Sequence, residues 1–264
     1  MRVKKVVEGV KAVTDGFVLD FSVDTKDDII DIASTHIEKS NIGPNIYYFG
    51  YKFNDNVPSS IRNKFISWLK MLKPNKNSIS SSDLYRFIEK PLAELDSACP
   101  LITFDAIVYP ESGRSPLVTD IMKVVLNYMN NDAIKIPTGL VKKLPQNVFF
   151  DMGAIKTICG DDINRYNQIS KYLNDIVLPK IRKSEYFSIA HEVPTKYRRY
   201  VRNFLKLPNN ELNVAHIMNS NKILIIDDIN TSGATLFEML RIIRTINHSA
   251  EIYVFTLVGK YLEI

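Results

Sequence analysis

Hydrophobic and polar positions form two kinds of segment that alternate along most of the chain. Short apolar runs closed by polar residues predict buried strands, and longer stretches with apolar residues three or four positions apart predict helices. In the second half of the chain, the pattern predicts strands at 104–109, 222–226 and 251–257 and helices at 116–130 and 233–246. These strand–loop–helix units favour an α/β fold with a parallel sheet flanked by helices.

The first hundred residues show a different pattern, which predicts an N-terminal α+β extension over 1–100 and a core over 101–264. In the extension we expect a hairpin at 3–21, a strand at 46–49 and helices at 27–38, 59–72 and 82–95. Within the core, residues 137–210 are too many for a plain connection between strands. We interpret them as a helical insertion with a long helix at 161–183 and a basic helix at 195–207. The extension and the insertion are both candidates for a hood over a ligand site.

The composition excludes several classes of protein. The 264 residues are 45% hydrophobic with a formal net charge of +5, and no apolar run approaches the roughly 18 residues of a membrane span. Cys99 and Cys159 are too few and too far apart for a disulfide framework or a cysteine zinc site. We therefore expect a cytoplasmic protein without a membrane partner. The positive charge permits an anionic partner but is too dilute to indicate a dedicated nucleic-acid binder.

The segment from Lys222 to Thr235 carries the most chemical information. An apolar strand delivers Asp227 and Asp228 at its C-terminal end, and a turn rich in hydroxyls with one glycine then enters a helix. Ligands of open α/β sheets bind at that end of the strands, and the amides of a helix N-terminus favour phosphate. Two carboxylates beside a phosphate would repel a bare anion, so they suit sugar hydroxyls or a bound cation. The segment therefore predicts a sugar phosphate ligand.

This segment resembles the phosphoribosyl pyrophosphate (PRPP) motif of the type I phosphoribosyltransferases, in which about four apolar residues precede two acidic ones and a hydroxyl-rich turn. The resemblance implies the fold of that family, ribose hydroxyls bound by the acidic pair, and a 5-phosphate bound by the turn. The alternative is an ordinary strand–turn–helix with solvated carboxylates. The PRPP-binding residues that the resemblance implies here are Asp227, Asp228, Asn230, Thr231, Ser232, Gly233, Ala234 and Thr235.

A second loop follows the strand at 104–109 and resembles the pyrophosphate-binding loop of the same family, closest to the form in glutamine amidophosphoribosyltransferases. Arg114 offers a planar fork of donors suited to phosphate oxygens. The alternative is a common Ser-Gly turn with Arg114 on the surface. The resemblance implies that Glu111, Ser112, Gly113, Arg114 and Ser115 bind PRPP.

By the same resemblance, the protein is a phosphoribosyltransferase, a pentosyl-transferring glycosyltransferase of nucleotide metabolism. It would transfer phosphoribose from PRPP to an unidentified nucleobase or amine, release pyrophosphate and use Mg²⁺. Asp227, Asp228 and Arg114 would be catalytic, with Mg²⁺ carried by PRPP and contacted by Asp227 or Asp228. Thr231 stands where 6-oxopurine salvage enzymes carry an aspartate, which disfavours hypoxanthine and guanine. Dimers are common in the family, so a homodimer is compatible with this function.

Two groups of basic residues lie outside these motifs. Lys142 and Lys143 are candidates for a flexible loop that closes over the ligand, or are simply solvated lysines. On the predicted helix at 195–207, Arg198, Arg199 and Arg202 share one side, which indicates an anion patch or a solvated face of a packing helix. The patch leaves an alternative function open, a PRPP-responsive nucleic-acid-binding regulator that kept the fold without turnover.

Overall fold

The computed structural model describes residues 10–13, 16–19, 30–37, 46–70, 81–98, 102–111, 117–129, 137–184, 188–208 and 211–259. Cys99 and four residues of the predicted pyrophosphate loop, Ser112, Gly113, Arg114 and Ser115, lie outside these ranges. Within them, no helix combines the length and the apolarity needed to cross a bilayer.

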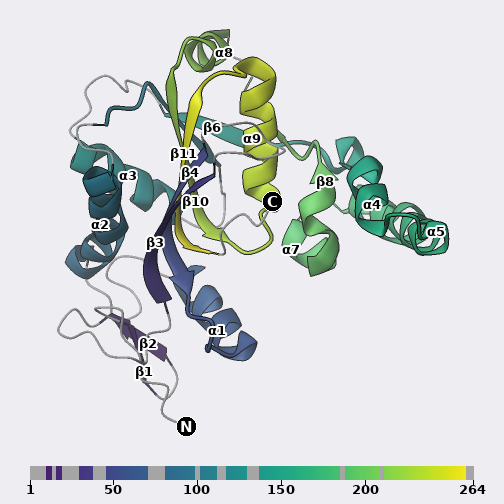
Figure 1. Cartoon of the computed structure of the whole chain (residues 1–264), viewed down its shortest axis with the longest axis horizontal. Coiled ribbons are helices and arrows are strands. Elements are labelled where there is room, and N and C mark those ends of the chain that lie inside the picture. The colour runs from purple at the N-terminus through teal and green to yellow at the C-terminus, as the bar shows by residue number, and fades with distance from the viewer. Residues whose placement is uncertain are drawn as a thin grey trace.

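A seven-stranded sheet forms the centre of the described fold, with the strand order β3-β4-β11-β10-β5-β6-β9 (Figure 1). The neighbours from β4 to β6 are parallel, whereas β3 and the two-residue β9 are antiparallel edges. The α/β fold with a mainly parallel sheet is thus confirmed. The strands are β3 (Ile30–Ile37), β4 (Ile46–Phe53), β5 (Ala106–Pro110), β6 (Thr138–Lys142), β9 (Leu205–Lys206), β10 (Lys222–Asn230) and β11 (Glu251–Gly259).

Helices cover both faces of this sheet. In Figure 1, α2 (Ser81–Ala98) and α3 (Leu117–Met129) lie on one side, and α9 (Ala234–Ile246) lies on the other. Each face of the sheet has its own hydrophobic core. The side chains of β10 point alternately into the two cores, so that Ile225 belongs to the core on the α9 side and Leu224 to the core on the α2 and α3 side. Because β10 is buried on both faces, its sequence is an uninterrupted apolar run rather than an alternating one.

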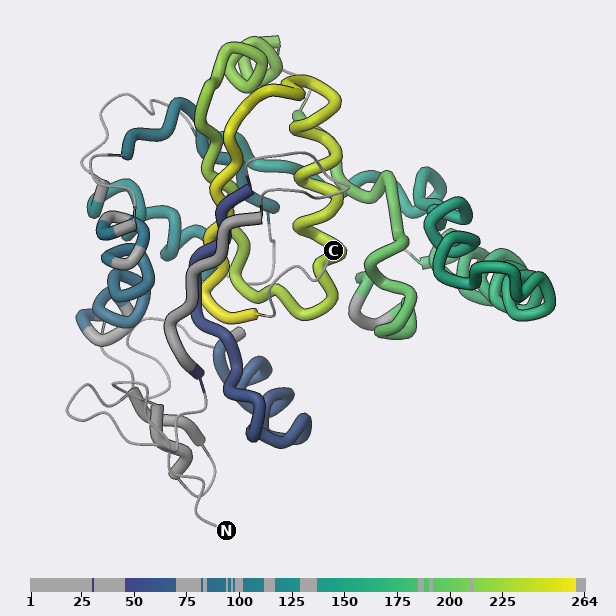
Figure 2. Tube along the Cα trace, viewed as in Figure 1, coloured from purple at the N-terminus to yellow at the C-terminus, as the bar shows by residue number. Residues whose placement is uncertain are grey.

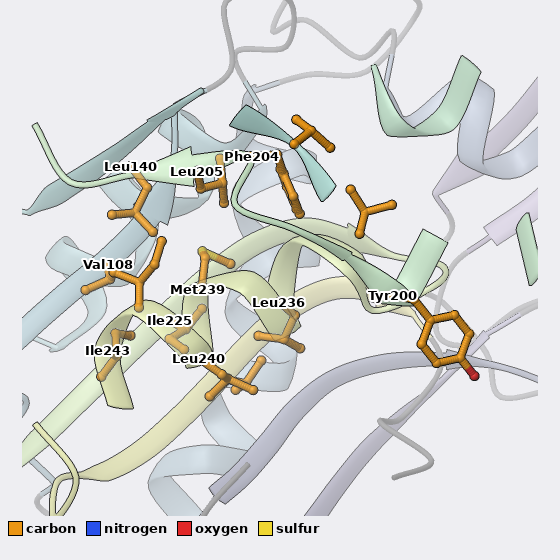
Figure 3. Close-up of a cluster of buried hydrophobic side chains, with 14 of the residues drawn as sticks. Val108, Leu140, Tyr200, Phe204, Leu205, Ile225, Leu236, Met239, Leu240 and Ile243 are labelled. Carbon is orange, nitrogen blue, oxygen red and sulfur yellow. The ribbon is translucent and has the colours of Figure 1, made fainter. Parts of the chain in front are cut away.

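The core on the α9 side fixes the helix that follows the acidic pair. Figure 3 shows side chains of α9 packed against those of the neighbouring strands. Burial of one large aliphatic side chain contributes roughly 1.5–3 kcal/mol, so this contact holds α9 firmly on the sheet. The labelled residues of this contact are Val108, Leu140, Phe204, Leu205, Ile225, Leu236, Met239, Leu240 and Ile243.

The N-terminal segment shares the sheet of the core, so residues 46–53 are not part of a separate unit: β4 pairs with β11 over seven positions. The helix predicted at 27–38 is wrong, because β3 forms there and pairs with β4 along its whole length. Its isoleucines fit either period, and the partner strand decides. The other described elements agree with prediction: the hairpin of β1 (Val10–Val13) and β2 (Gly16–Leu19), and the helices α1 (Ser59–Lys70) and α2.

Most of the predicted insertion forms an arm that extends away from the sheet (Figure 2). The predicted long helix is confirmed as one helical run, which starts after Asp162 because that side chain accepts a hydrogen bond from the Arg165 amide at 2.9 Å. The arm comprises η1 (Pro145–Asn147), β7 (Phe149–Phe150), α4 (Met152–Cys159), α5 (Ile163–Tyr172), the π-helix η2 (Leu173–Val177), α6 (Leu178–Lys183), α7 (Ile189–Glu192), η3 (Thr195–Tyr200) and β8 (Val201–Arg202).

The π-helical turn η2 has an identifiable cause. Pro179 lacks the amide that would bind the Asp175 carbonyl, and its ring crowds that carbonyl. A wider turn immediately before the proline accommodates both effects, so the helix continues instead of ending.

The basic helix predicted at 195–207 is wrong. The structure has the 3-10 helix η3 and then two short strands, β8 paired with β7 and β9 paired with β6. Asn203, at φ 64°, turns the chain between them. The aromatic spacing of this segment reflects burial of Tyr197 and Tyr200 from η3 and of Phe204 from the turn between β8 and β9, and in the sequence it resembles helical spacing.

Beyond the arm, the chain returns to the sheet at β9, and α8 (Glu211–Met218) then precedes β10.

Candidate active site

The two carboxylates lie within the last part of β10, which is longer than predicted and ends at Asn230. Asp227 is buried and Asp228 is half-buried. The Asp228 amide donates to Asp227 Oδ1 at 2.9 Å, and the Ile229 amide donates to Asp228 Oδ1 at 2.7 Å. Each carboxylate therefore has one oxygen fixed by the backbone, which sets its orientation before any ligand binds.

The turn after β10 enters α9 through a glycine in the left-handed region. Gly233 has φ 74° and ψ −4°, and α9 begins with no side-chain cap and no acidic residue in its first turn. The amides of a first helical turn have no partner inside the helix, and the helix dipole adds partial positive charge there. This end of α9 therefore suits an anion.

Replacement of Gly233 by alanine tests the turn. A Cβ in the left-handed region costs roughly 1–2 kcal/mol, so we expect the free energy of unfolding of Gly233→Ala to fall by about 1 kcal/mol. Urea denaturation followed by circular dichroism measures the change. Unaltered stability would show that the backbone at this position is not held at positive φ.

The strand end and the turn line an open pocket of about 120 Å³. This volume is several times what one water molecule needs. The arm contributes two further lining residues, Ile189 and Arg198. The structure thus brings together every residue predicted in this segment, Asp227, Asp228, Asn230, Thr231, Ser232, Gly233, Ala234 and Thr235, in one wall of a single pocket.

Arg198 reaches this pocket from a distant part of the chain. Its Nε donates to the Val193 carbonyl at 2.8 Å, and partial burial lowers the pKa of its guanidinium. The hydrogen bond fixes the side chain, and burial makes the cation a stronger partner for an anion because water screens it less. The sequence indicates that Arg198 is one of several basic residues, but no sequence pattern predicts that Arg198 or Ile189 lines this pocket.

The other two arginines of the predicted patch have different surroundings. Arg199 Nε donates to the Tyr200 hydroxyl at 2.7 Å, and Arg202 forms an ion pair with Asp151 at 3.3 Å. The three arginines therefore do not share the face of one helix as predicted, although Arg202 lies against Arg199, whose carbonyl accepts a hydrogen bond from Arg202 Nη1 at 2.5 Å.

The end of β5 lies beside the end of β10. The two strands are parallel neighbours, with Ile225 opposite Val108. Glu111 directly follows β5, and its amide donates to the Leu140 carbonyl of β6 at 2.9 Å. The predicted pyrophosphate loop therefore starts at the same edge of the sheet as the phosphate turn, and its next four residues lie outside the described part.

The lysines predicted for a flexible loop lie in paired backbone instead. Lys142 is the last residue of β6 and pairs with Leu205, and the Lys143 amide donates to the Phe204 carbonyl at 2.8 Å. Lys143 Nζ also donates to Asn203 Oδ1. The loop expected here is wrong, because β9 returns alongside this segment, and neither lysine lines the pocket.

The lining of the pocket suits a metal ion that binds together with a phosphate ligand. In the described ranges, no group of three or more His, Cys, Asp or Glu side chains converges as a metal site would. Mg²⁺ is commonly held by one or two carboxylates together with phosphate oxygens and water. Asp227 and Asp228 supply that number of carboxylates at the pocket.

No protein-family model matches the chain, and no curated protein is significantly similar to it. The pocket at the end of β10 therefore has to be interpreted from its own geometry.

Proposed function

We propose that the protein is a phosphoribosyltransferase that transfers phosphoribose from PRPP to a nitrogenous acceptor and releases pyrophosphate. One observation carries the proposal: the acidic pair and the whole hydroxyl-rich turn line one pocket at the carboxyl end of β10. The parallel pairing of β10 with β5 supports it, because a ligand held by both strand ends would span the two loops. The type I phosphoribosyltransferase fold is part of the same proposal.

Different residues of the site suit different parts of the donor PRPP. The amides at the start of α9 and the hydroxyls of Thr231, Ser232 and Thr235 suit the 5-phosphate. The carboxylates of Asp227 and Asp228 suit the ribose hydroxyls, since an ionised carboxylate is a strong acceptor. The loop that starts at Glu111 would hold the pyrophosphate end.

The reaction follows from this arrangement. The bond between the anomeric carbon and the pyrophosphate oxygen breaks, and its electron pair leaves with pyrophosphate. The acceptor nitrogen forms the new bond to carbon with its lone pair and releases its proton to pyrophosphate or to water. Positive charge develops on the ribose, where the carboxylates of Asp227 and Asp228 stabilise it. When bound, Mg²⁺ offsets negative charge on the leaving group.

Donor binding and turnover test the proposal directly. We expect calorimetry to show saturable binding of PRPP in the presence of Mg²⁺, with competition by ribose 5-phosphate. A panel of bases and amines should contain an acceptor that releases pyrophosphate from PRPP. A protein that binds neither PRPP nor ribose 5-phosphate would sink the proposal.

Arg198 should contribute to donor binding, and Arg199 provides a matched control. Arg198→Ala removes a cation from the pocket wall, so we expect the affinity for PRPP to fall by roughly tenfold, near 1.4 kcal/mol. Arg199→Ala removes the same charge from a residue outside the pocket and should leave the affinity unchanged. Equal losses in both variants would mean that only the net charge of the arm matters.

The alternative of a PRPP-responsive nucleic-acid-binding regulator depends on a basic helical face over 195–207. Only residues 195–200 of that segment are helical, as the 3-10 helix η3, and Arg199 and Arg202 contact other side chains of the arm. We therefore favour the transferase. Turnover of PRPP without nucleic acid is the result that separates the two functions.

A further inference from the structure

The arm contains a second cavity, of about 380 Å³. One wall comes from Tyr172 and from the π-helical turn that follows it, through Ile176. A second wall comes from the end of α7 and from η3, through Glu192, Thr195 and Arg198, and Lys180 adjoins this wall through its ion pair with Glu192. This volume lies at the lower end of the range of pockets that bind small organic molecules.

The second cavity adjoins the pocket at the end of β10. Arg198 lines both spaces. The short helix α7 also faces both, since Ile189 lines the first and Glu192 the second. Figure 1 shows α7 between α9 and the outer helices of the arm, in agreement with this shared wall. A transfer reaction needs its two reactants side by side, and these two spaces have that relation.

The first wall of the second cavity is apolar and exposed. Tyr172 and Ile176 keep 37% and 59% of their surface accessible, although both are large hydrophobic residues. They are four residues apart in one helical run and lie on the same side of it. The π-helical turn begins directly after Tyr172 and includes Ile176, and such turns are frequent at functional sites. This wall offers a surface on which a flat ring can stack.

The second wall supplies polar groups at the edge of that surface. Glu192 is only 18% exposed, and its carboxylate pairs with Lys180 Nζ at 3.3 Å. A half-buried carboxylate is a strong acceptor for an N–H group, and the hydroxyl of Thr195 and the ammonium of Lys180 are donors. One apolar face and a mixed polar edge together match a planar ring that carries nitrogen and oxygen atoms.

We infer that the second cavity binds the acceptor, and that the acceptor is a free heteroaromatic base with an N–H group directed at Glu192. The location rests on the proposed function, because it takes the pocket at β10 as the donor site. A free base fits better than a base within a polynucleotide, since the volume of about 380 Å³ lies at the lower end of the range of pockets for small organic molecules.

A cavity-filling substitution tests the location. With the chain of 264 residues, binding of adenine, cytosine and nicotinamide is measured by ligand-observed NMR, and binding of PRPP with Mg²⁺ by calorimetry. We expect at least one base to bind the wild type and Ile176→Trp to weaken it about tenfold or more, because the larger side chain occupies the space of the ring. Affinity for PRPP should not change.

Ile163→Trp is the matched control, since Ile163 is exposed in the same helical run but does not line the cavity. Glu192→Gln keeps the shape and removes the charge, so it should weaken an N–H base more than its N-methylated analogue. Absence of binding by all three bases, equal binding by Ile176→Trp and wild type, or binding of a single-stranded oligonucleotide but no free base would overturn the inference. If PRPP does not bind the wild type, the proposed function fails, whereas the base measurements still decide whether the cavity is a ligand site.

Discussion

Replacement of Gly50 by alanine should destabilise the protein more than any other single methyl group added to a described glycine. Gly50 lies in β4 at φ 152°, and a Cβ at this position would be 1.9 Å from the carbonyl oxygen of Thr256 in β11. That oxygen belongs to the backbone of an inner strand, so it cannot move aside as a flexible side chain would. Backbone strain and overpacking together predict a loss of about 3 kcal/mol or more in the free energy of unfolding.

Urea denaturation of Gly50→Ala and Gly153→Ala measures this difference. A Cβ on Gly153, in α4, would meet only Asp151 Oδ1 at 3.5 Å, an ordinary contact. Alanine is favoured over glycine in a helix by roughly 0.5–1 kcal/mol, so this control should be neutral or slightly stabilised. If both variants were equally stable, the close approach of β4 to β11 would be refuted.

Removal of the charge of Asp228 should give the largest loss of donor affinity. Asp228→Asn keeps an oxygen that can accept the Ile229 amide, so the strand end should retain its shape. A hydrogen bond to a charged group is worth roughly 1.5–3 kcal/mol, which predicts PRPP binding weaker by about ten- to a hundredfold. Calorimetry with PRPP and Mg²⁺ measures the change.

Asp161→Asn removes the same charge from an exposed residue of the arm and should leave the affinity for PRPP unaltered. Thermal unfolding of both variants confirms that they are folded. Undiminished binding by Asp228→Asn would refute contact between this carboxylate and the ribose.

The local part of the site could be predicted from the sequence because one continuous segment encodes it. The apolar run of β10, the acidic pair and Gly233 each constrain the backbone nearby. The helix α9 begins within the same segment from Lys222 to Thr235. These features depend only on residues that are close along the chain, and the structure has the strand, the turn and the helix that they predict.

Contacts between distant segments account for what could not be predicted. The isoleucines of β3 fit a helix or a strand, and only pairing with β4 decides between them. Between residues 195 and 207, buried aromatic residues of short elements imitate a helical pattern. The placement of Arg198 in the same pocket as Asp227 depends on the path of the whole arm, which no local sequence pattern predicts.

The segment from Tyr200 to Leu205, where the arm joins the sheet, belongs to the hydrophobic core that α9 covers. Tyr200, Phe204 and Leu205 pack in the same cluster as Leu236 and Met239 of α9. Because Arg198 lies in η3 together with Tyr200, we expect its position to depend on the packing of this segment against α9. Hydrogen exchange should find the amides around η3 and those of α9 opening as one cooperative unit, and a ligand bound between them should slow exchange in both segments at once.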